Sequence, residues 1–579
     1  MFESIEREIE SSLQENIDRQ QIREHVDALA GLRRYPGTDD QWAAAEYIID
    51  TLNDGGVTTE LSTFEAYTSV PGNANVTVTA PTRRELSDPI TIAFSGNTPE
   101  GGVHGEVVHV DTIGDDPDTL GQVSGRVVFT RGLPTPAKVR TLEAADAAAV
   151  VFRSPTEGYL HEMIVSPVWG SPSSENADEL PDLPVVEIHV DDGKWLAERL
   201  GGDTVEATVE TQTTTELTEL PCPIARIEGT ESDRYMVVGN HIDSWHEGVT
   251  DNGTAVAASM ELARIFATNP PKRGIVFGFW PGHSMGRYAG SARYADDNWL
   301  DLRENGVAYL HIDLNGLDGA DRIWSQHMAE VESEHLDILE EASLPLDDGS
   351  GDGDLIAISD RPGRNSDQSF WGTGLSSLLS GARFSADHED SGPVGGGWWW
   401  HTPADTRDKV DFDLLIEEVE LYVAIISRFC NSPILPHDFQ ETSKEIRETV
   451  DEIANSAGDA VNFSPVYHRL DTLDTQLAEF TTAVDDRNAD GIDADVEDLQ
   501  VRLGNHLIPA LYMSEPEYKH DPALPHDLLP ALREAEQLPN LIGPKRAFTE
   551  RTVARNVTKL AHQIDQTIDT LESFLDYQA

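Results

Sequence analysis

Cysteine is almost absent from this chain of 579 residues. Cys222 and Cys430 are the only two, they lie far apart, and the sequence contains no Cys-x-x-Cys motif. This excludes a framework of disulfides and a cysteine-rich zinc module. The length is too great for one compact core, so we expect several domains.

Basic residues are also scarce, at 41 Lys and Arg against 104 Asp and Glu, which gives a formal net charge of −63. Such a charge argues against nucleic acid or an anionic membrane as a partner. The apolar fraction of 39% is too high for a disordered acidic chain. The excess of acidic over basic residues is typical of a halophilic protein that is stabilised by screening salt. An ordinary acidic protein is the alternative.

Long hydrophobic runs are missing as well. No stretch approaches the roughly 18 apolar residues that a membrane span needs, so we expect no span. The segment 1–10 predicts the start of an acidic amphipathic helix, without the basic and apolar regions of a secretory signal. These features favour a cytoplasmic enzyme.

The segment 235–254 contains the first candidate site. A short apolar run ends near His241 and Asp243, and Asp251 opens a segment of helical periodicity. Ligands collect where strand ends meet helix starts in an open α/β sheet. Imidazole and carboxylate suit zinc and related ions, Asp251 has two oxygens with which to bridge two metals, and Asp243 is placed to orient His241. The alternative is a polar loop with Asp251 as a helix N-cap.

Three further segments carry candidate polar side chains. His283 and Ser284 follow an apolar run, and Asp313 ends another. His401 lies in the segment 395–406, beside three glycines and three tryptophans that suggest an aromatic wall around a pocket. His283 suits a metal ligand or a general base. A structural histidine and a tryptophan core remain as alternatives.

Alternating strand and helix patterns predict an α/β fold, with a mixed, mainly parallel sheet and helices on both faces. A β-rich segment interrupts it, and three apolar stripes at helical spacing end the chain in a helical bundle. Such stripes form a core or a dimer interface. The predicted divisions are an N-terminal part of the α/β domain at 1–74, an inserted domain at 75–220, the domain with the metal site at 221–432, and the helical domain at 433–579.

The order His-x-Asp, Asp-Asn-Gly-Thr, Trp-x-Gly-x-x-x-Gly-x-x-Gly-Ser, strand-Asp and His-Thr-x-x-Asp-Thr resembles the co-catalytic zinc aminopeptidase family. The resemblance is greatest to its glutamate carboxypeptidase and transferrin receptor branch. It implies a peptidase-like domain, an inserted protease-associated domain, a homodimer formed through the helical domain, and a peptide or N-acyl amino-acid substrate.

By this resemblance, His241 would bind one zinc ion, Asp251 would bridge two, and Asp313 and His401 would bind the other. Asp243 would orient His241, and Asp405 would do the same for His401. The resemblance implies a metallo-exopeptidase with one or two divalent ions, in which zinc, manganese or cobalt activates water as the nucleophile.

The sequence departs from the family at His283-Ser284, where the family carries Glu-Glu. The first Glu is the general base, and the second is a zinc ligand. Three outcomes are open: His283 replaces the missing ligand, or His283 acts as the base beside one metal, or hydrolysis is lost. In the last case the protein is a metal-binding, homodimeric scaffold of the transferrin receptor type.

Overall fold

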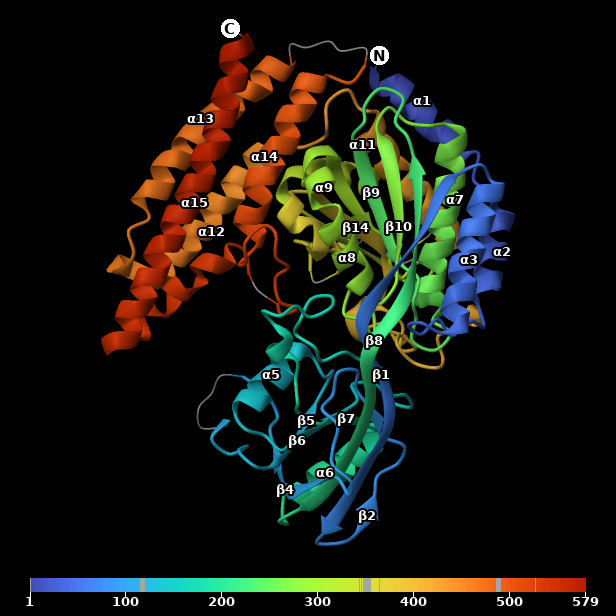
Figure 1. The fold of residues 1–579 in the computed structure, drawn as a ribbon, viewed down its shortest axis with the longest axis vertical. Coiled ribbons are helices and arrows are strands. Elements are labelled where there is room, and N and C mark those ends of the chain that lie inside the picture. The colour runs from blue at the N-terminus through green and yellow to red at the C-terminus, as the bar shows by residue number, and fades with distance from the viewer. Residues whose placement is uncertain are drawn as a thin grey trace.

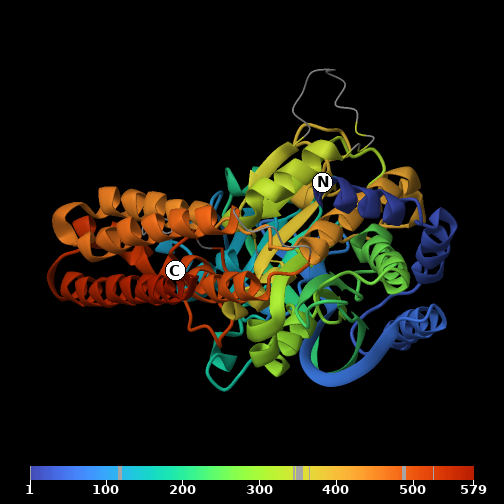
Figure 2. The ribbon, with the colours of Figure 1, turned by 90° about the horizontal axis from the view of Figure 1, so that it is seen from above.

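Two long strands, β1 (Thr58–Ala80) and β8 (Glu206–Ile227), form an antiparallel ribbon that joins an upper and a lower sheet (Figure 1). The structure is a computed structural model that describes residues 2–578 except 115–119, 343, 345, 347–355, 364, 486–490 and 526. A helical bundle lies beside the upper sheet, as the view from above also shows (Figure 2).

The upper sheet has the strand order β13-β12-β14-β11-β9-β10-β8. Its strands besides β8 are β9 (Tyr235–His241), β10 (Gly274–Trp280), β11 (Gly306–His311), β12 (Arg322–His327), β13 (Ile356–Asp360) and β14 (Ser376–Arg383). The four central strands β14, β11, β9 and β10 are parallel, and β8 and β12 join them antiparallel. The predicted mixed, mainly parallel sheet is therefore confirmed.

Both faces of this sheet are covered because its strands are apolar on both sides, as buried parallel strands are. Met236 and Val238 of β9 join one hydrophobic cluster, and Tyr235 and Val237 join another on the opposite face. The first cluster includes α2 (Arg19–Leu29), α3 (Asp39–Asp54), α7 (Thr254–Thr268) and α11 (Phe412–Asn431). The second includes α8 (Ala289–Asp297) and α9 (Trp299–Asn305). The first cluster also receives Leu13 of α1 (Phe2–Gln14) and Ile338 and Leu339 of α10 (Glu332–Glu341).

The lower sheet continues from β8 in the order β8-β4-β5-β6-β7-β3, and β4 to β7 are parallel. Its elements are β2 (Arg84–Glu85), β3 (Ile90–Thr91), β4 (Val103–His109), β5 (Val127–Arg131), α5 (Pro136–Ala144), β6 (Ala149–Arg153), β7 (Val185–Ile188) and α6 (Val190–Leu200). We call residues 81–205 the lower module. The boundaries predicted at 74 and 220 fall inside β1 and β8, because both strands serve both sheets.

The C-terminal part is a bundle of four long helices. They are α12 (Phe439–Ala457), α13 (Ser464–Asp485), α14 (Ala494–Tyr512) and α15 (Gly543–Gln578). Ile446, Leu473 and Ile564, one from each apolar stripe, are buried in the cluster that α11 also joins. The stripes therefore form a core within the chain. Among the described residues, no helix has both the length and the apolarity of a membrane span.

Candidate metal centre

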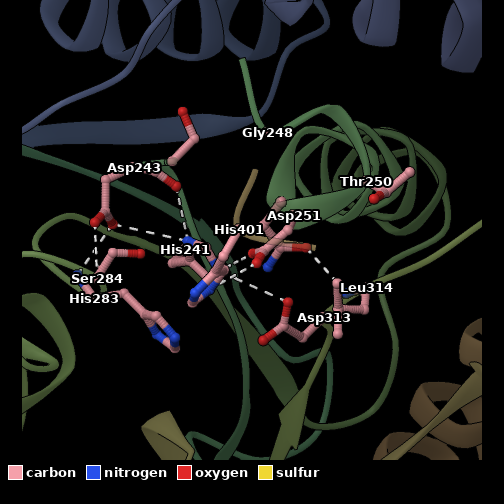
Figure 3. A network of polar contacts seen from close by, with 12 residues as sticks. His241, Asp243, Gly248, Thr250, Asp251, His283, Ser284, Asp313, Leu314 and His401 are labelled. Atoms are coloured by element: carbon pink, nitrogen blue, oxygen red, sulfur yellow. Dashed lines mark hydrogen bonds and ion pairs between the residues drawn. The ribbon is translucent and has the colours of Figure 1, made fainter. Parts of the chain in front are cut away.

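The structure brings His241, Asp251, Asp313 and His401 together at the carboxyl edge of the parallel strands (Figure 3). His241 ends β9, and Asp313 follows β11. Asp251 lies in the turn Val249–Gly253 that leads into α7, and His401 lies in the loop before α11. Ligand sites of open α/β sheets lie at this edge, because strand ends and helix starts meet there.

Asp251 lies between the two imidazoles. Its Oδ1 is 3.0 Å from Nε2 of His241, and its Oδ2 is 3.1 Å from Nε2 of His401 (Figure 3). Burial alone raises the pKa of the Asp251 carboxyl, but its contacts with both histidines outweigh burial and lower it below the ordinary range. One carboxylate thus faces two ring nitrogens, as a carboxylate that bridges two cations does.

Backbone carbonyls fix the tautomer of both histidines. Nδ1 of His241 lies 2.8 Å from the carbonyl oxygen of Asp243, and Nδ1 of His401 lies 2.6 Å from that of Glu162. Because a carbonyl can only accept, each Nδ1 carries the proton and donates it. In the neutral rings, each Nε2 lone pair then points at a carboxylate oxygen. Such an arrangement is stable only with a cation, either a metal ion or a proton.

Asp313 supplies the next donor. Its Oδ1 is 3.7 Å from Nε2 of His241, and this buried oxygen has no hydrogen-bond partner among the described residues. A buried carboxylate oxygen left unpaired is costly unless a cation balances it. The expected grouping of Asp313 with His401 is therefore wrong, since the fold places Asp313 beside His241.

His283 lies against His241 with the rings stacked, their centroids 3.9 Å apart and their planes at 11°. Donor atoms of His241, His283 and Asp313 all lie within 4.8 Å of one another, which makes this trio a candidate metal site. Nδ1 of His283 is 3.3 Å from Oγ of Ser366. Burial, followed by the charge of His241, lowers the pKa of His283 well below its usual value.

Asp243 acts on two parts of the site. Its backbone carbonyl holds His241, whereas its carboxylate accepts hydrogen bonds from the amides of His283 and Ser284, at 3.0 and 2.9 Å. The carboxylate oxygen is 3.8 Å from Nδ1 of His241. Asp243 therefore orients His241 mainly through its carbonyl, and it also fixes the turn that carries His283.

Asp405 was expected to orient His401, but its carboxylate holds a different part of the site. Its carboxylate accepts hydrogen bonds from the amide and hydroxyl of Thr250, at 2.9 and 2.8 Å, and from the amide of Asp251 at 3.0 Å. Burial raises the pKa of the Asp405 carboxyl to about 7. Asp405 thus holds the turn of Asp251, and the partner of His401 is Glu162.

Glu162, in the lower module, was not identified from the sequence. Its amide donates to the carbonyl of His401 at 3.1 Å, and its own carbonyl accepts from the His401 ring. Burial raises the pKa of its carboxyl to about 8. No spacing signal links Glu162 to His401, because only the folded ribbon of β1 and β8 brings the lower module to this edge.

The tryptophan segment packs beside the site, and Trp399 belongs to the largest hydrophobic cluster, which agrees with the alternative of a tryptophan core. Trp400 stacks on His401, with ring centroids 3.5 Å apart, and Nε1 of Trp399 donates to the hydroxyl of Thr250 at 3.2 Å. The fully buried Arg34 was also not singled out. It donates to the carbonyls of Ile242 and Gly248, at 2.8 and 2.9 Å, and so holds the loop between His241 and Asp251.

The donor set fits a zinc-like divalent ion, because zinc accepts imidazole nitrogen and carboxylate oxygen. One half-site has His241, Asp251 and Asp313, with His283 nearby. The other has His401 and the second oxygen of Asp251. The first therefore has enough ligands for tight binding, and the second is poor in ligands.

The chain combines a mixed, mainly parallel α/β sheet with imidazole and carboxylate donors gathered at the carboxyl edge of its parallel strands. Residues 224–425 match the model of peptidase family M28. "Probable glutamate carboxypeptidase VP8" of Zea mays is 25% identical over 340 residues, which cover 48% of this chain and 47% of that protein. The chain thus matches about half the length of this relative.

Two solved structures are similar in fold. An aminopeptidase from Aneurinibacillus sp. strain AM-1 has a TM-score of 0.56 and 19% identity, with 73% of this chain and 96% of that chain covered. The zinc aminopeptidase of Bacillus subtilis has a TM-score of 0.54 and 18% identity, with 70% and 94% covered. At these identities, the likeness concerns the fold.

Proposed function

We propose that this protein is a metal-dependent hydrolase, an exopeptidase that cleaves amide bonds of peptides or N-acyl amino acids. The observation that carries the proposal is Asp251, whose two oxygens each face the Nε2 lone pair of a histidine. The match of residues 224–425 to peptidase family M28 supports it. The names of the relatives, a carboxypeptidase and aminopeptidases, favour peptides as substrates.

His241, Asp251 and Asp313 would hold one divalent ion, zinc by its donor set, with manganese or cobalt as substitutes. A bound ion supplies Lewis acidity that lowers the pKa of water and polarises a carbonyl. His283 would accept the proton of the attacking water and return it to the amine nitrogen that leaves. Its ring lies within reach of the donors of His241 and Asp313, and the hydroxyl of Ser366 lies 3.3 Å from its Nδ1.

The substitution His283→Ala tests this role. We expect turnover to fall by about 10²–10⁴-fold, the contribution of a general base, while the protein stays folded and retains its metal. Turnover on a peptide library and metal content by elemental analysis are measured together in molar salt. Normal turnover would show that His283 is not the base. Loss of metal together with activity would make His283 a ligand.

The second candidate is a metal-binding scaffold without hydrolysis. The pair His283-Ser284 favours it, because the resemblance would place this pair where the family carries Glu-Glu. This candidate predicts no cleavage of any aminoacyl or N-acyl amino-acid substrate with zinc, manganese or cobalt in high salt. One substrate cleaved by the wild type, and not by His283→Ala, rejects it.

We further propose that residues 75–220 are a protease-associated domain and that the chain forms a homodimer through the helices of residues 433–579. The charge of −63 supports a cytoplasm rich in salt as the working environment. Light scattering in molar salt tests the assembly, and a monomeric mass would count against the dimer.

A further inference from the structure

His311 is a buried histidine, beside the metal centre, that the proposed chemistry does not use. It is the last residue of β11 and lies two positions before Asp313. Its Nε2 is 3.3 Å from Oδ2 of Asp313, and its Nδ1 is 3.4 Å from the hydroxyl of Tyr309. That hydroxyl is 3.1 Å from Nε1 of Trp280. These four side chains form a continuous polar chain that ends on a candidate metal ligand.

The direction of the hydrogen bonds follows from the indole of Trp280, which can only donate. Tyr309 accepts from Trp280, so its own proton is available for Nδ1 of His311. His311 then carries its proton on Nε2 and donates it to Asp313. The opposite tautomer would place the Nε2 lone pair against a carboxylate oxygen, which is repulsive. Trp280 at one end of this series of hydrogen bonds and Asp313 at the other therefore favour the same tautomer of His311, with the proton on Nε2.

We propose that His311 is a positioning residue that makes Asp313 a ligand through one oxygen. The bond from His311 occupies Oδ2, while Oδ1 lies 3.7 Å from Nε2 of His241 and has no hydrogen-bond partner in the described part of the chain. Partners of this kind orient metal ligands and commonly change metal affinity by about 10–100-fold. The inference rests on the proposed metal site at His241, Asp251 and Asp313.

His311 is not itself a ligand in this arrangement. The trio of donors within 4.8 Å of one another, as found in the described residues, consists of His241, His283 and Asp313. The ring of His311 stands parallel to that of His283 at 11°, with centroids 6.4 Å apart. Its Nε2 is directed at Asp313, so His311 acts on the ion through that carboxylate.

The test compares zinc affinity of the folded full-length protein and two variants, measured by competition with a chromogenic chelator in molar salt. His311→Gln retains an amide N–H that reaches Asp313, and we expect its dissociation constant to stay within about threefold of the wild type. His311→Asn has the same chemistry but is too short, and we expect binding about 10–100-fold weaker. Equal affinity of all three proteins would overturn the proposal.

His335→Gln is the matched control. His335 is a buried histidine of the same domain, whose Nε2 lies 3.1 Å from the hydroxyl of Ser380. Because both histidines are buried, we expect the two substitutions to disturb the fold to a similar degree. Weaker zinc binding in His335→Gln as well would therefore assign the effect to stability and overturn the proposal. A wild type that takes up no zinc would instead reject the proposed function. Circular dichroism confirms that each variant is folded.

Discussion

The two halves of the proposed metal centre are unequal in the number of their donors. His241, Asp251 and Asp313 serve the first half, while the second has His401 and the other oxygen of Asp251. Structural and catalytic zinc sites have at least three protein ligands, so the second half lacks one. By the resemblance drawn from the sequence, Ser284 would take the place of the family's carboxylate ligand, and a neutral hydroxyl would be a poor substitute.

Ser284→Glu should therefore restore a third ligand to the His401 half. We expect the number of zinc ions bound per chain to rise from one to two, as measured by elemental analysis after dialysis in molar salt. Ser284→Gln has the same size without the charge and should remain at one. Two ions in the wild type, or one in Ser284→Glu, would contradict this explanation of the asymmetry.

At the scale of elements, the loop between β9 and α7 depends on a segment more than 200 residues earlier. The guanidinium of Arg34, in the connection between α2 and α3, donates to the carbonyls of Leu29, Ile242, Glu247 and Gly248. These bonds satisfy backbone groups that the loop would otherwise bury unpaired. The connection therefore fixes the distance between His241 and Asp251.

Arg34→Leu should lower the free energy of unfolding by about 3–5 kcal/mol, since it leaves several buried carbonyls without donors. Urea unfolding in molar salt measures the change, and zinc affinity should fall with it because the loop carries Asp251. Arg33→Ala is the control, since Arg33 is exposed, and should change stability by less than about 0.5 kcal/mol. Equal effects of both substitutions would show that the loop does not depend on the buried guanidinium.

At the scale of the whole molecule, several histidines remote from the metal centre are buried in the neutral form. Burial lowers the pKa of His335 and of His437 to about 3, and that of His25 to about 4. Both ring nitrogens of His437 are buried without hydrogen-bond partners among the described residues. All three take up protons more readily in the unfolded chain.

Stability should consequently fall as the pH drops below about 6.5. The pKa of each histidine is lower in the folded protein than in the unfolded chain. Its contribution to the free energy of unfolding is therefore present above the pKa of the unfolded chain and is lost as the pH falls. Each histidine accounts for about 2 kcal/mol between neutral pH and pH 5. Urea unfolding at pH 7.5 and 5.0 measures how much the free energy of unfolding falls between these two values. In His437→Phe this fall should be smaller by about one third of what the three histidines contribute together. An unchanged difference in that variant would exclude His437 as a source.

The sequence predicted the main elements well because local periodicity determines them. The apolar runs that end near His241, before His283 and at Asp313 correspond to β9, β10 and β11. His241 and Asp313 were found because they end apolar runs. Asp251 was found because it opens a segment of helical periodicity, and His401 because it lies beside the glycines and tryptophans of 395–406. His311 was detectable in principle, since it lies two residues before Asp313 on the same face of its strand.

The pairing of donors could not be predicted in the same way. Asp313 belongs with His241, and Asp405 supports Asp251, because the order of strands in the sheet brings them together. Glu162 reaches His401 only through the ribbon of β1 and β8. Contacts between residues this far apart depend on the relative placement of whole elements, which periodicity does not encode.

The amino-acid sequence by itself determined the alternation of strands and helices, the acidic surface and the identity of the donor side chains, because each follows from residue type and local spacing. Tertiary structure alone decided which donors share a half-site, which groups hold them and which tautomer each histidine adopts. The physical reason is that these properties depend on distances and hydrogen-bond directions between strand ends, and those are set only when the sheet, the lower module and the helices pack.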